Sequence, residues 1–401
     1  MESEGNIDPK YSLIAKAFFE NFEYNDEIGA SLCVYHDDKL VIDIWSGYKD
    51  LKKQELWEEN TVVPFFSTTK VVAASCLAIC HSRGLFDYKD KVSKYWKSFA
   101  KNGKGNITIA QLLQHRGGLA AIEKKLTIEL IKDRELLEEI IAEQKPYWNP
   151  GSFQGYHCWT IGWYISALLS KIDTKKRRLK EFVEEDILPN INGEIRVGID
   201  ESFDFSRIAI LKPISKTKGL FSMPFKFVKE FFNPWSLTSK SMLNPSFVSN
   251  HANFNRKDVL ELEFGSGGGI GNAKGIASLF NGMTNPKHLL FLGKNTLDYL
   301  TQYPESPKHG FEDLVLKQNS FIFHAGFMKP SDQHNFSLHR SAFGGFGAGG
   351  SFVISDTENN LTFAYTMNNM SQEMMNMKRE VQIRKAVYKT IANNEYKVVN
   401  T

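Results

Sequence analysis

Ser67 and Lys70, three positions apart, are the pair in this chain best suited to nucleophilic chemistry. An apolar run over 71–80 follows them and predicts a buried helix, so both side chains should share one face of its first turn. A serine hydroxyl needs a base to become a nucleophile at neutral pH, and a lysine with a lowered pKa can provide or assist that base. The free N–H groups at the helix start would also stabilise an oxyanion. Taken alone, the motif is equally compatible with a serine that caps a core helix.

A second candidate is Tyr156, which follows the turn residues Pro150 and Gly151 and precedes an apolar helix expected over 159–170. The turn would hold its phenol rigidly near Ser67. There, a neighbouring lysine could lower the tyrosine pKa and make the phenolate a general base. Without the other residues, a packed core tyrosine is the simpler interpretation.

The third candidate is the glycine-rich run 343–351. Glycines let a backbone approach a ligand closely, and an exposed N–H in this run would serve as a second oxyanion donor. A phosphate-binding loop is the rival interpretation. It is disfavoured because a strand follows, so no helix dipole would point at the anion.

Composition places the chain among ordinary globular proteins: 401 residues, 42% hydrophobic, 24% charged and a net charge of +3. Nothing in this balance indicates nucleic acid, and the basic run 171–180 is typical of a solvated turn. No apolar stretch reaches the about 18 residues of a membrane span. The acidic start, residues 1–5, resembles neither a secretory nor an import signal, so we expect a cytoplasmic location.

Four cysteines lie in apolar surroundings without metal-ligand spacing, which predicts buried free thiols in a reducing compartment: Cys33, Cys76, Cys80 and Cys158. The ten histidines contain no His-x-His-x-Asp-His cluster, so a zinc-dependent enzyme is not expected. His115 and His157 are interpreted as structural. We expect neither a metal nor a cofactor.

Strand patterns lie near both ends of the chain, and helical patterns dominate the middle. The predicted helices are 9–24, 128–143, 159–170, 179–187, 273–281 and 372–393; the predicted strands are 28–35, 39–45, 320–328, 350–355 and 361–367. This order indicates an α+β fold, with an antiparallel sheet and terminal helices from 1–65 and 265–401. A mostly helical domain, 66–264, would carry an irregular insertion over about 212–255, and a site would lie in the cleft between the two parts.

In this order, the segments resemble the serine β-lactamase-related superfamily, in the branch of class C-like β-lactamases, esterases and animal β-lactamase-domain proteins. The matching segments are Ser67–Lys70, Asn106–Leu119, Pro150–His157, Gly269–Ala273 and Gly347–Ser351. The resemblance implies an acyl-enzyme on Ser67, deprotonation assisted by Lys70 and a proton relay through Tyr156. It also implies an oxyanion hole from the backbone N–H groups of Ser67 and Ala348. The substrate site would be lined by Leu119, Gly345, Phe346 and Gly347.

Two departures from the family pattern shape the expected activity. Cys158 stands where β-lactamases carry an asparagine, and Gly345 stands where the family carries a lysine or histidine. The missing cation would help bind a substrate carboxylate, so β-lactam hydrolysis is not expected. Uncharged small esters or amides fit better, with Phe346 as an apolar wall.

The sequence therefore predicts a serine hydrolase, esterase-like, acting on a small acyl substrate. Retention of Ser67, Lys70 and Tyr156 together favours this hypothesis. The alternative is a catalytically degenerate protein that serves as a binding or self-assembling scaffold, forming a homo-oligomer, and Gly345 favours that alternative.

Overall fold

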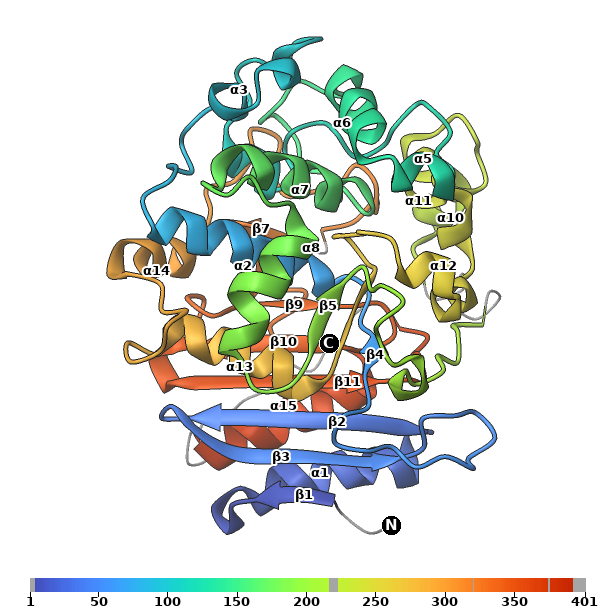
Figure 1. Cartoon of the computed structure of the whole chain (residues 1–401), viewed down its shortest axis with the longest axis vertical. Coiled ribbons are helices and arrows are strands. Elements are labelled where there is room, and N and C mark those ends of the chain that lie inside the picture. The colour runs from blue at the N-terminus through green and yellow to red at the C-terminus, as the bar shows by residue number, and fades with distance from the viewer. Residues whose placement is uncertain (1–3, 216–222, 320, 374–375, 392–401) are drawn as a thin grey trace.

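The computed structural model describes residues 4–215, 223–319, 321–373 and 376–391 (Figure 1). Its strands are β1 (Glu4–Ile7), β2 (Gly29–His36), β3 (Lys39–Gly47), β4 (Val63–Pro64), β5 (Ile195–Val197), β6 (Gly269–Gly271), β7 (Ile322–His324), β8 (Phe327–Lys329), β9 (Phe343–Phe346), β10 (Phe352–Asp356) and β11 (Leu361–Met367). Its helices are α1 (Ser12–Tyr24), α2 (Thr68–Ser82), α3 (Val92–Tyr95), α4 (Ile109–Leu113), α5 (Ile128–Lys132), α6 (Arg134–Glu143), α7 (Thr160–Ile172), α8 (Leu179–Phe182), α10 (Phe225–Phe231), α11 (Leu237–Leu243), α12 (Lys257–Leu260), α13 (Ala273–Thr284), α14 (Lys294–Thr301) and α15 (Lys378–Ile391).

An eight-stranded antiparallel sheet joins the two ends of the chain in the order β1-β3-β2-β11-β10-β9-β8-β7. Its central pairing aligns β2 with β11, from Ala30 opposite Met367 to His36 opposite Leu361. Both strands are almost wholly buried, which requires helices on both faces. The predicted antiparallel sheet is confirmed.

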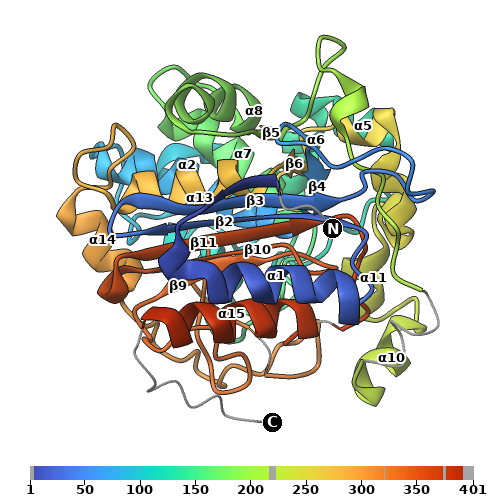
Figure 2. The ribbon, with the colours of Figure 1, turned by 90° about the horizontal axis from the view of Figure 1, so that it is seen from below.

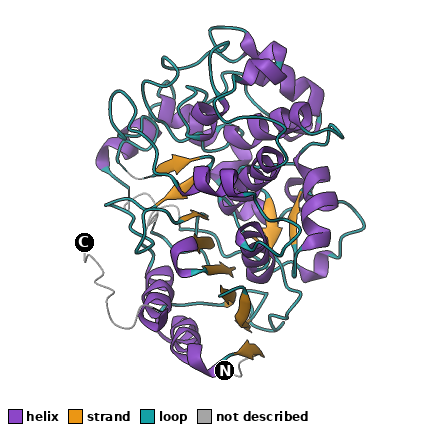
Figure 3. Ribbon diagram, turned by 90° about the vertical axis from the view of Figure 1, so that its left-hand side faces the viewer, coloured by secondary structure: helices purple, strands orange, loops and turns teal. Residues whose placement is uncertain are grey.

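Helices cover the sheet in two layers. Figure 2 shows α1 and α15 side by side on one face and α13 with α2 on the other. Figure 3 shows most helices gathered at the end of the molecule away from the N-terminus. In this helical part, α7 packs against α2. Because every residue of α2 from Thr68 to Cys80 is buried, this helix is the centre of the core. The α+β class is confirmed, as are the four buried free thiols.

A second, three-stranded sheet with the order β4-β6-β5 connects the two predicted domains. Its strand β5 belongs to the segment 66–264, whereas β4 and β6 belong to the other part. The division at residues 65 and 264 stays a prediction. Across the described residues, no helix combines the length and apolar character needed to cross a lipid bilayer.

Several predicted elements are divided differently. The helix expected over 128–143 is two helices, because Asp133 leaves helical geometry and caps α6 through Leu136 N–H. The strand expected over 320–328 is the hairpin β7–β8, which turns at Ala325 and Gly326, both with positive φ; residue 320 lies outside the described part. The helix expected from 372 begins at 378, and residues 374–375 and 392–393 are not described.

The expected insertion over 212–255 contains α10 and α11. Its residues 216–222 lie outside the described part of the chain. Phe247 and Phe254 of the insertion join the main core. The apolar side chains of α10 and α11 pack instead with Trp148, Val315 and Leu316 in a cluster separate from that core. Tyr156 borders the same cluster, so the insertion flanks the tyrosine of the candidate site.

A buried charge network ties α15 to the loop before β2. Arg379 Nη1 lies 2.5 Å from Glu27 Oε2, which also accepts the hydroxyl of Tyr365, and Arg379 Nη2 donates to Asn369 O at 2.7 Å. Both Glu27 and Arg379 are almost completely buried. Removing one partner would leave a charge without solvent or counterion.

Arg379→Met should therefore lower the free energy of unfolding by about 3–5 kcal/mol, measured as a shift of the urea midpoint. Arg340→Met is the matched control, because its ion pair with Asp332 is exposed and such pairs contribute about 0–1 kcal/mol. Equal effects of the two substitutions would contradict a stabilising role for the buried network.

Candidate active site

The turn between β4 and α2 presents Ser67 at the start of the buried helix. Phe66, the residue before it, has a φ of 45°, a left-handed conformation that is strained for a bulky side chain. Packing holds it there, since its ring lies 4.7 Å from that of Phe254 and 5.3 Å from that of His251. Sequence reasoning missed this turn because no glycine marks it.

The side chains of Lys70 and Tyr156 converge on Ser67. Lys70 Nζ donates to Ser67 Oγ at 3.0 Å, and the hydroxyl of Tyr156 donates to the same oxygen at 2.9 Å. Ser67 and Tyr156 are partly exposed, whereas Lys70 is buried. The structure thus brings the three predicted residues together, with the serine oxygen between two groups that can exchange protons.

Burial sets the state of the Lys70 amine. Its second polar contact is the carbonyl of Ser266 at 2.6 Å, and the rings of Tyr156 and Trp159 lie 5.0 and 5.8 Å away. Burial lowers the pKa of Lys70 to about 8, because desolvation disfavours the charged form. A substantial neutral fraction near physiological pH makes this amine suitable as a base for Ser67. Ser266 was missed, although the glycines around it indicated an unusual backbone.

Tyr156 differs from expectation in its electrostatics. Burial raises the pKa of Tyr156 far above its ordinary value, so the prediction of a lowered pKa beside Lys70 is wrong. The uncompensated desolvation of a phenolate is the physical reason. The neutral phenol donates its proton toward Ser67 Oγ, so it is not a phenolate that could act as a resting general base.

Two neutral histidines and an aspartate hold the backbone around Tyr156. The N–H of Tyr156 donates to Asp313 Oδ1 at 3.1 Å, and the N–H of His157 donates to His115 Nδ1 at 2.9 Å. His157 Nε2 accepts the N–H of Leu119 at 2.9 Å. Burial lowers the pKa of His157 to about 4 and that of His115 well below its usual value. Their predicted structural role fits this arrangement.

Cys158 occupies the position of the family's asparagine as a neutral thiol. It is buried, and burial raises its pKa to about 11. The residue therefore adds neither charge nor a strong hydrogen bond to the site.

Hydrogen bonds of Ser351 link the glycine-rich turn to the start of α2. Its Oγ donates to Phe65 O at 2.8 Å and lies 3.0 Å from Thr68 Oγ1, while its carbonyl accepts Gly347 N–H at 2.7 Å. This clamp brings Gly347–Ser351 beside the Ser67 turn. The backbone N–H groups of Ser67 and Ala348 donate no hydrogen bond to another described residue. Both remain available to an oxyanion, as the resemblance implies.

The other predicted substrate residues are placed differently. Residues 343–346 are a strand rather than a loop, so neighbouring side chains alternate between faces. A Cβ on Gly345 would lie 2.5 Å from Val71 Cγ1, so this residue packs against α2. Phe346 points to the opposite face, where it packs against His334, Phe336 and Phe352. The prediction of Phe346 as a wall of the site is wrong.

Leu119 belongs to the scaffold. Its side chain is completely buried, its N–H donates to His157, and its carbonyl accepts Thr160 Oγ1 at 2.7 Å. The predicted substrate contact at Leu119 is therefore wrong. Gly347 lies nearer the chemistry, because a Cβ there would be 2.2 Å from Phe65 O, two residues before Ser67.

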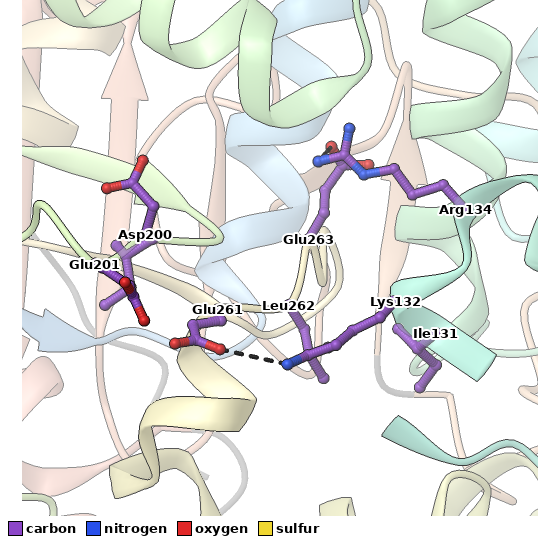
Figure 4. Close-up of a pocket in the computed structure, with 9 residues that line it drawn as sticks. Ile131, Lys132, Arg134, Asp200, Glu201, Glu261, Leu262 and Glu263 are labelled. Atoms are coloured by element: carbon purple, nitrogen blue, oxygen red, sulfur yellow. Dashed lines mark hydrogen bonds and ion pairs between the residues drawn. The ribbon is translucent and has the colours of Figure 1, made fainter. Parts of the chain in front are cut away.

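A separate charged pocket of about 350 Å³ lies near α5 and the end of β5 (Figure 4). Its lining is Ile131, Lys132, Arg134, Ile199, Asp200, Glu201, Glu261, Leu262 and Glu263. Lys132 pairs with Glu261 at 3.4 Å, and Glu263 accepts the N–H of Lys180 at 3.0 Å. These contacts join α5 and α8 to the segment that follows α12, so we interpret the pocket as a structural charge cluster.

Comparisons with known proteins agree with this geometry. A family VIII carboxylesterase of known structure superposes with a TM-score of 0.84 at 25% identity, covering 97% of this chain and all 100% of the other. EstA from Arthrobacter nitroguajacolicus gives a TM-score of 0.83 at 26% identity, covering 99% and 100%. The chain is also 26% identical over 374 residues to Esterase/beta-lactamase LipL of Mycobacterium tuberculosis, covering 91% of this chain and 83% of LipL.

Fold and relatives define a protein of the serine β-lactamase-related superfamily. The Beta-lactamase family model matches residues 16–388. The chain belongs to that family.

The reactivity of Ser67 should rise with pH. The pKa of Lys70 is about 8, and below it the amine is protonated and cannot accept the serine proton. Labelling of Ser67 by a fluorophosphonate should therefore accelerate as the pH rises through this value. The measurement is the rate of adduct formation by intact mass.

Lys104→Met is the matched control for this pH profile. Burial also lowers the pKa of Lys104 to about 8, but its amine donates to the carbonyls of Lys101, Ala142 and Gln144 and to no hydroxyl among the described residues. The profile should persist in this variant and vanish with all labelling in Lys70→Met. A rate independent of pH between about 6 and 10 would exclude Lys70 as the base.

Proposed function

We propose that this protein is a serine hydrolase that cleaves small uncharged acyl esters, or amides, through an acyl-enzyme on Ser67. One observation carries the proposal: Ser67 Oγ lies 3.0 Å from the Lys70 amine and 2.9 Å from the Tyr156 hydroxyl. Packing alone does not require a buried lysine and a tyrosine to meet at one serine oxygen.

In the proposed acylation step, neutral Lys70 accepts the Ser67 proton as Oγ attacks the substrate carbonyl carbon. The N–H groups of Ser67 and Ala348 stabilise the oxyanion. When the ester bond breaks, the Tyr156 hydroxyl protonates the leaving alkoxide and regains a proton from Lys70. Water then attacks the acyl-enzyme by the reverse route, which releases the acid and restores Ser67.

The choice of uncharged substrates rests on Gly345. Family members with a cation at this position can pair with a substrate carboxylate, whereas Val71 fills the corresponding space here. The names of LipL, EstA and the family VIII carboxylesterase support ester hydrolysis. Because LipL is also named a β-lactamase, a chromogenic β-lactam belongs in the substrate panel, where we expect little or no turnover.

The scaffold alternative predicts a different reactivity of Ser67, since a protein that only binds or assembles does not require an activated serine hydroxyl. Self-assembly into a homo-oligomer and a cytoplasmic location both stay predictions. Neither one affects the chemistry proposed for Ser67.

Ser67→Ala should abolish fluorophosphonate labelling and lower turnover of a short acyl ester by at least about 10³-fold. The exposed Ser246→Ala is the control and should behave as wild type. Wild-type protein that forms no adduct, or a variant that keeps its activity, would favour the scaffold alternative. Thermal melting should be nearly unchanged in both variants.

Tyr156→Phe tests the proton relay separately. The variant keeps the ring, which stacks on Phe323 at 5.8 Å, but loses the hydroxyl. We expect kcat to fall about 10²–10⁴-fold with a smaller change in KM. The loss should be smaller for esters whose leaving group needs no protonation, such as a nitrophenol. An equal loss for acidic and alkyl leaving groups would contradict the relay.

A further inference from the structure

Three large aromatic side chains project from the α10 region into solvent. Phe225, Phe232 and Trp235 are exposed by 83%, 67% and 84%, within eleven residues of sequence. Together with the exposed Lys226 and Lys229, they form what we call the aromatic patch. Single exposed apolar residues such as Leu289 are common, whereas several exposed within one short segment are more typical of an interaction surface.

The helix α10, which carries part of the aromatic patch, is itself packed against the protein. On the inner side of α10, Phe227 stacks on Phe231 at 5.8 Å and packs into the cluster with Trp148, Val315 and Leu316. Figure 2 shows α10 at the edge of the molecule, away from the main sheet. The outward aromatics are therefore displayed on a fixed element, and burying them elsewhere in this chain would require α10 to leave its cluster.

Charge around the patch is strongly one-sided. Residues 205–257 contain nine lysines and arginines but a single carboxylate, Glu230. The remaining chain has 40 basic and 45 acidic residues, from totals of 49 and 46. Four of these cations, Arg207, Lys240, Arg256 and Lys257, pair with carboxylates outside the segment. Lys226 and Lys229 of α10 form no ion pair with a described carboxylate. The segment that carries the exposed aromatics therefore keeps an excess of positive charge, which suits an anionic partner.

We propose that the aromatic patch binds the surface of an anionic lipid bilayer, with α10 lying in the headgroup region. Phe and Trp side chains insert at the boundary of headgroups and acyl chains, while lysines extend toward lipid phosphates. A second copy of the chain fits less well. Three aromatic side chains of about 200 Å² each fall short of the about 800 Å² per partner of a standard interface. A two-fold contact would also oppose Lys226 and Lys229 to themselves.

The position of the patch connects it to the candidate site. Tyr156 borders the cluster that anchors α10, and Trp159, whose ring faces Lys70, donates to Met242 O in α11 at 3.1 Å. A patch on the bilayer would therefore place the Ser67 site near the lipid surface. Resting on the proposed function, this favours membrane-held acyl esters as the substrate class.

The test is flotation with vesicles of phosphatidylcholine alone or with about 30% phosphatidylserine. Wild-type protein should float with the anionic vesicles, and binding should weaken as salt rises from about 0.1 to 0.5 M. The triple variant Phe225→Ser, Phe232→Ser, Trp235→Ser should bind at least tenfold more weakly. Lys226→Glu with Lys229→Glu should lose a similar factor, since each lysine contributes roughly fivefold.

Matched controls replace equally exposed residues elsewhere. Tyr24→Ser, Leu56→Ser and Leu289→Ser remove exposed apolar side chains, and Lys16→Glu with Lys294→Glu reverse exposed lysines. These variants should bind like wild type. No flotation of wild type, or equal losses in patch and control variants, would overturn the proposal. Patch-dependent dimers in sedimentation without vesicle binding, or patch-dependent retention on an oligonucleotide without vesicle binding, would also overturn it.

Two substrates separate this proposal from the proposed function. A water-soluble short ester should be hydrolysed equally by wild type and the triple variant, whereas a long-chain ester in anionic vesicles should be hydrolysed at least tenfold faster by wild type. Flotation of inactive Ser67→Ala should equal that of wild type. Failure of hydrolysis with intact flotation would contradict only the proposed function.

Discussion

The burial of the Lys70 amine is the constraint on which the site depends. Among the described residues, no carboxylate pairs with this amine, so its charge is poorly compensated and its pKa falls. The amine must still satisfy its hydrogen bonds, and it does so with Ser67 Oγ and Ser266 O. A buried amine in these surroundings can either lose its proton or bind a partner with which it exchanges a proton. Ser67 is such a partner.

Two other buried lysines show what distinguishes Lys70. Lys104 donates to three backbone carbonyls, and so does Lys329, whose pKa burial lowers to about 7. A carbonyl has no proton to give, so a lowered lysine pKa there has structural consequences only. At Lys70, a hydroxyl replaces one of these carbonyls and is itself hydrogen-bonded by Tyr156. The chemistry follows from the partner rather than from the pKa.

Sequence patterns could predict the sheet from its periodicity, and they could predict the meeting of Ser67, Lys70 and Tyr156 from several short motifs that occur in a fixed order along the chain. They failed where tertiary packing overrides local preference. Strand β9 is rich in glycine, and its extended form depends on pairing with β10 and on contact with α2. Once it is a strand, its alternation places Gly345 and Gly347 toward α2 and Phe346 on the other face. The raised pKa of Tyr156 likewise depends on burial that spacing does not reveal.

Close backbone contacts explain how one helix start can gather partners from distant segments. A Cβ on Gly162 of α7 would lie 2.3 Å from the backbone of Gly265, and the N–H of Gly162 donates to Ser266 Oγ at 2.7 Å. This contact fixes α7 against the loop whose carbonyl holds Lys70. Gly347 allows a similarly close approach on the other side of the site, since a Cβ there would lie 2.2 Å from Phe65 O. Larger residues at either position would push a partner away from Ser67 without altering any side chain that reacts, so the site's geometry is set by the absence of side chains as much as by their presence.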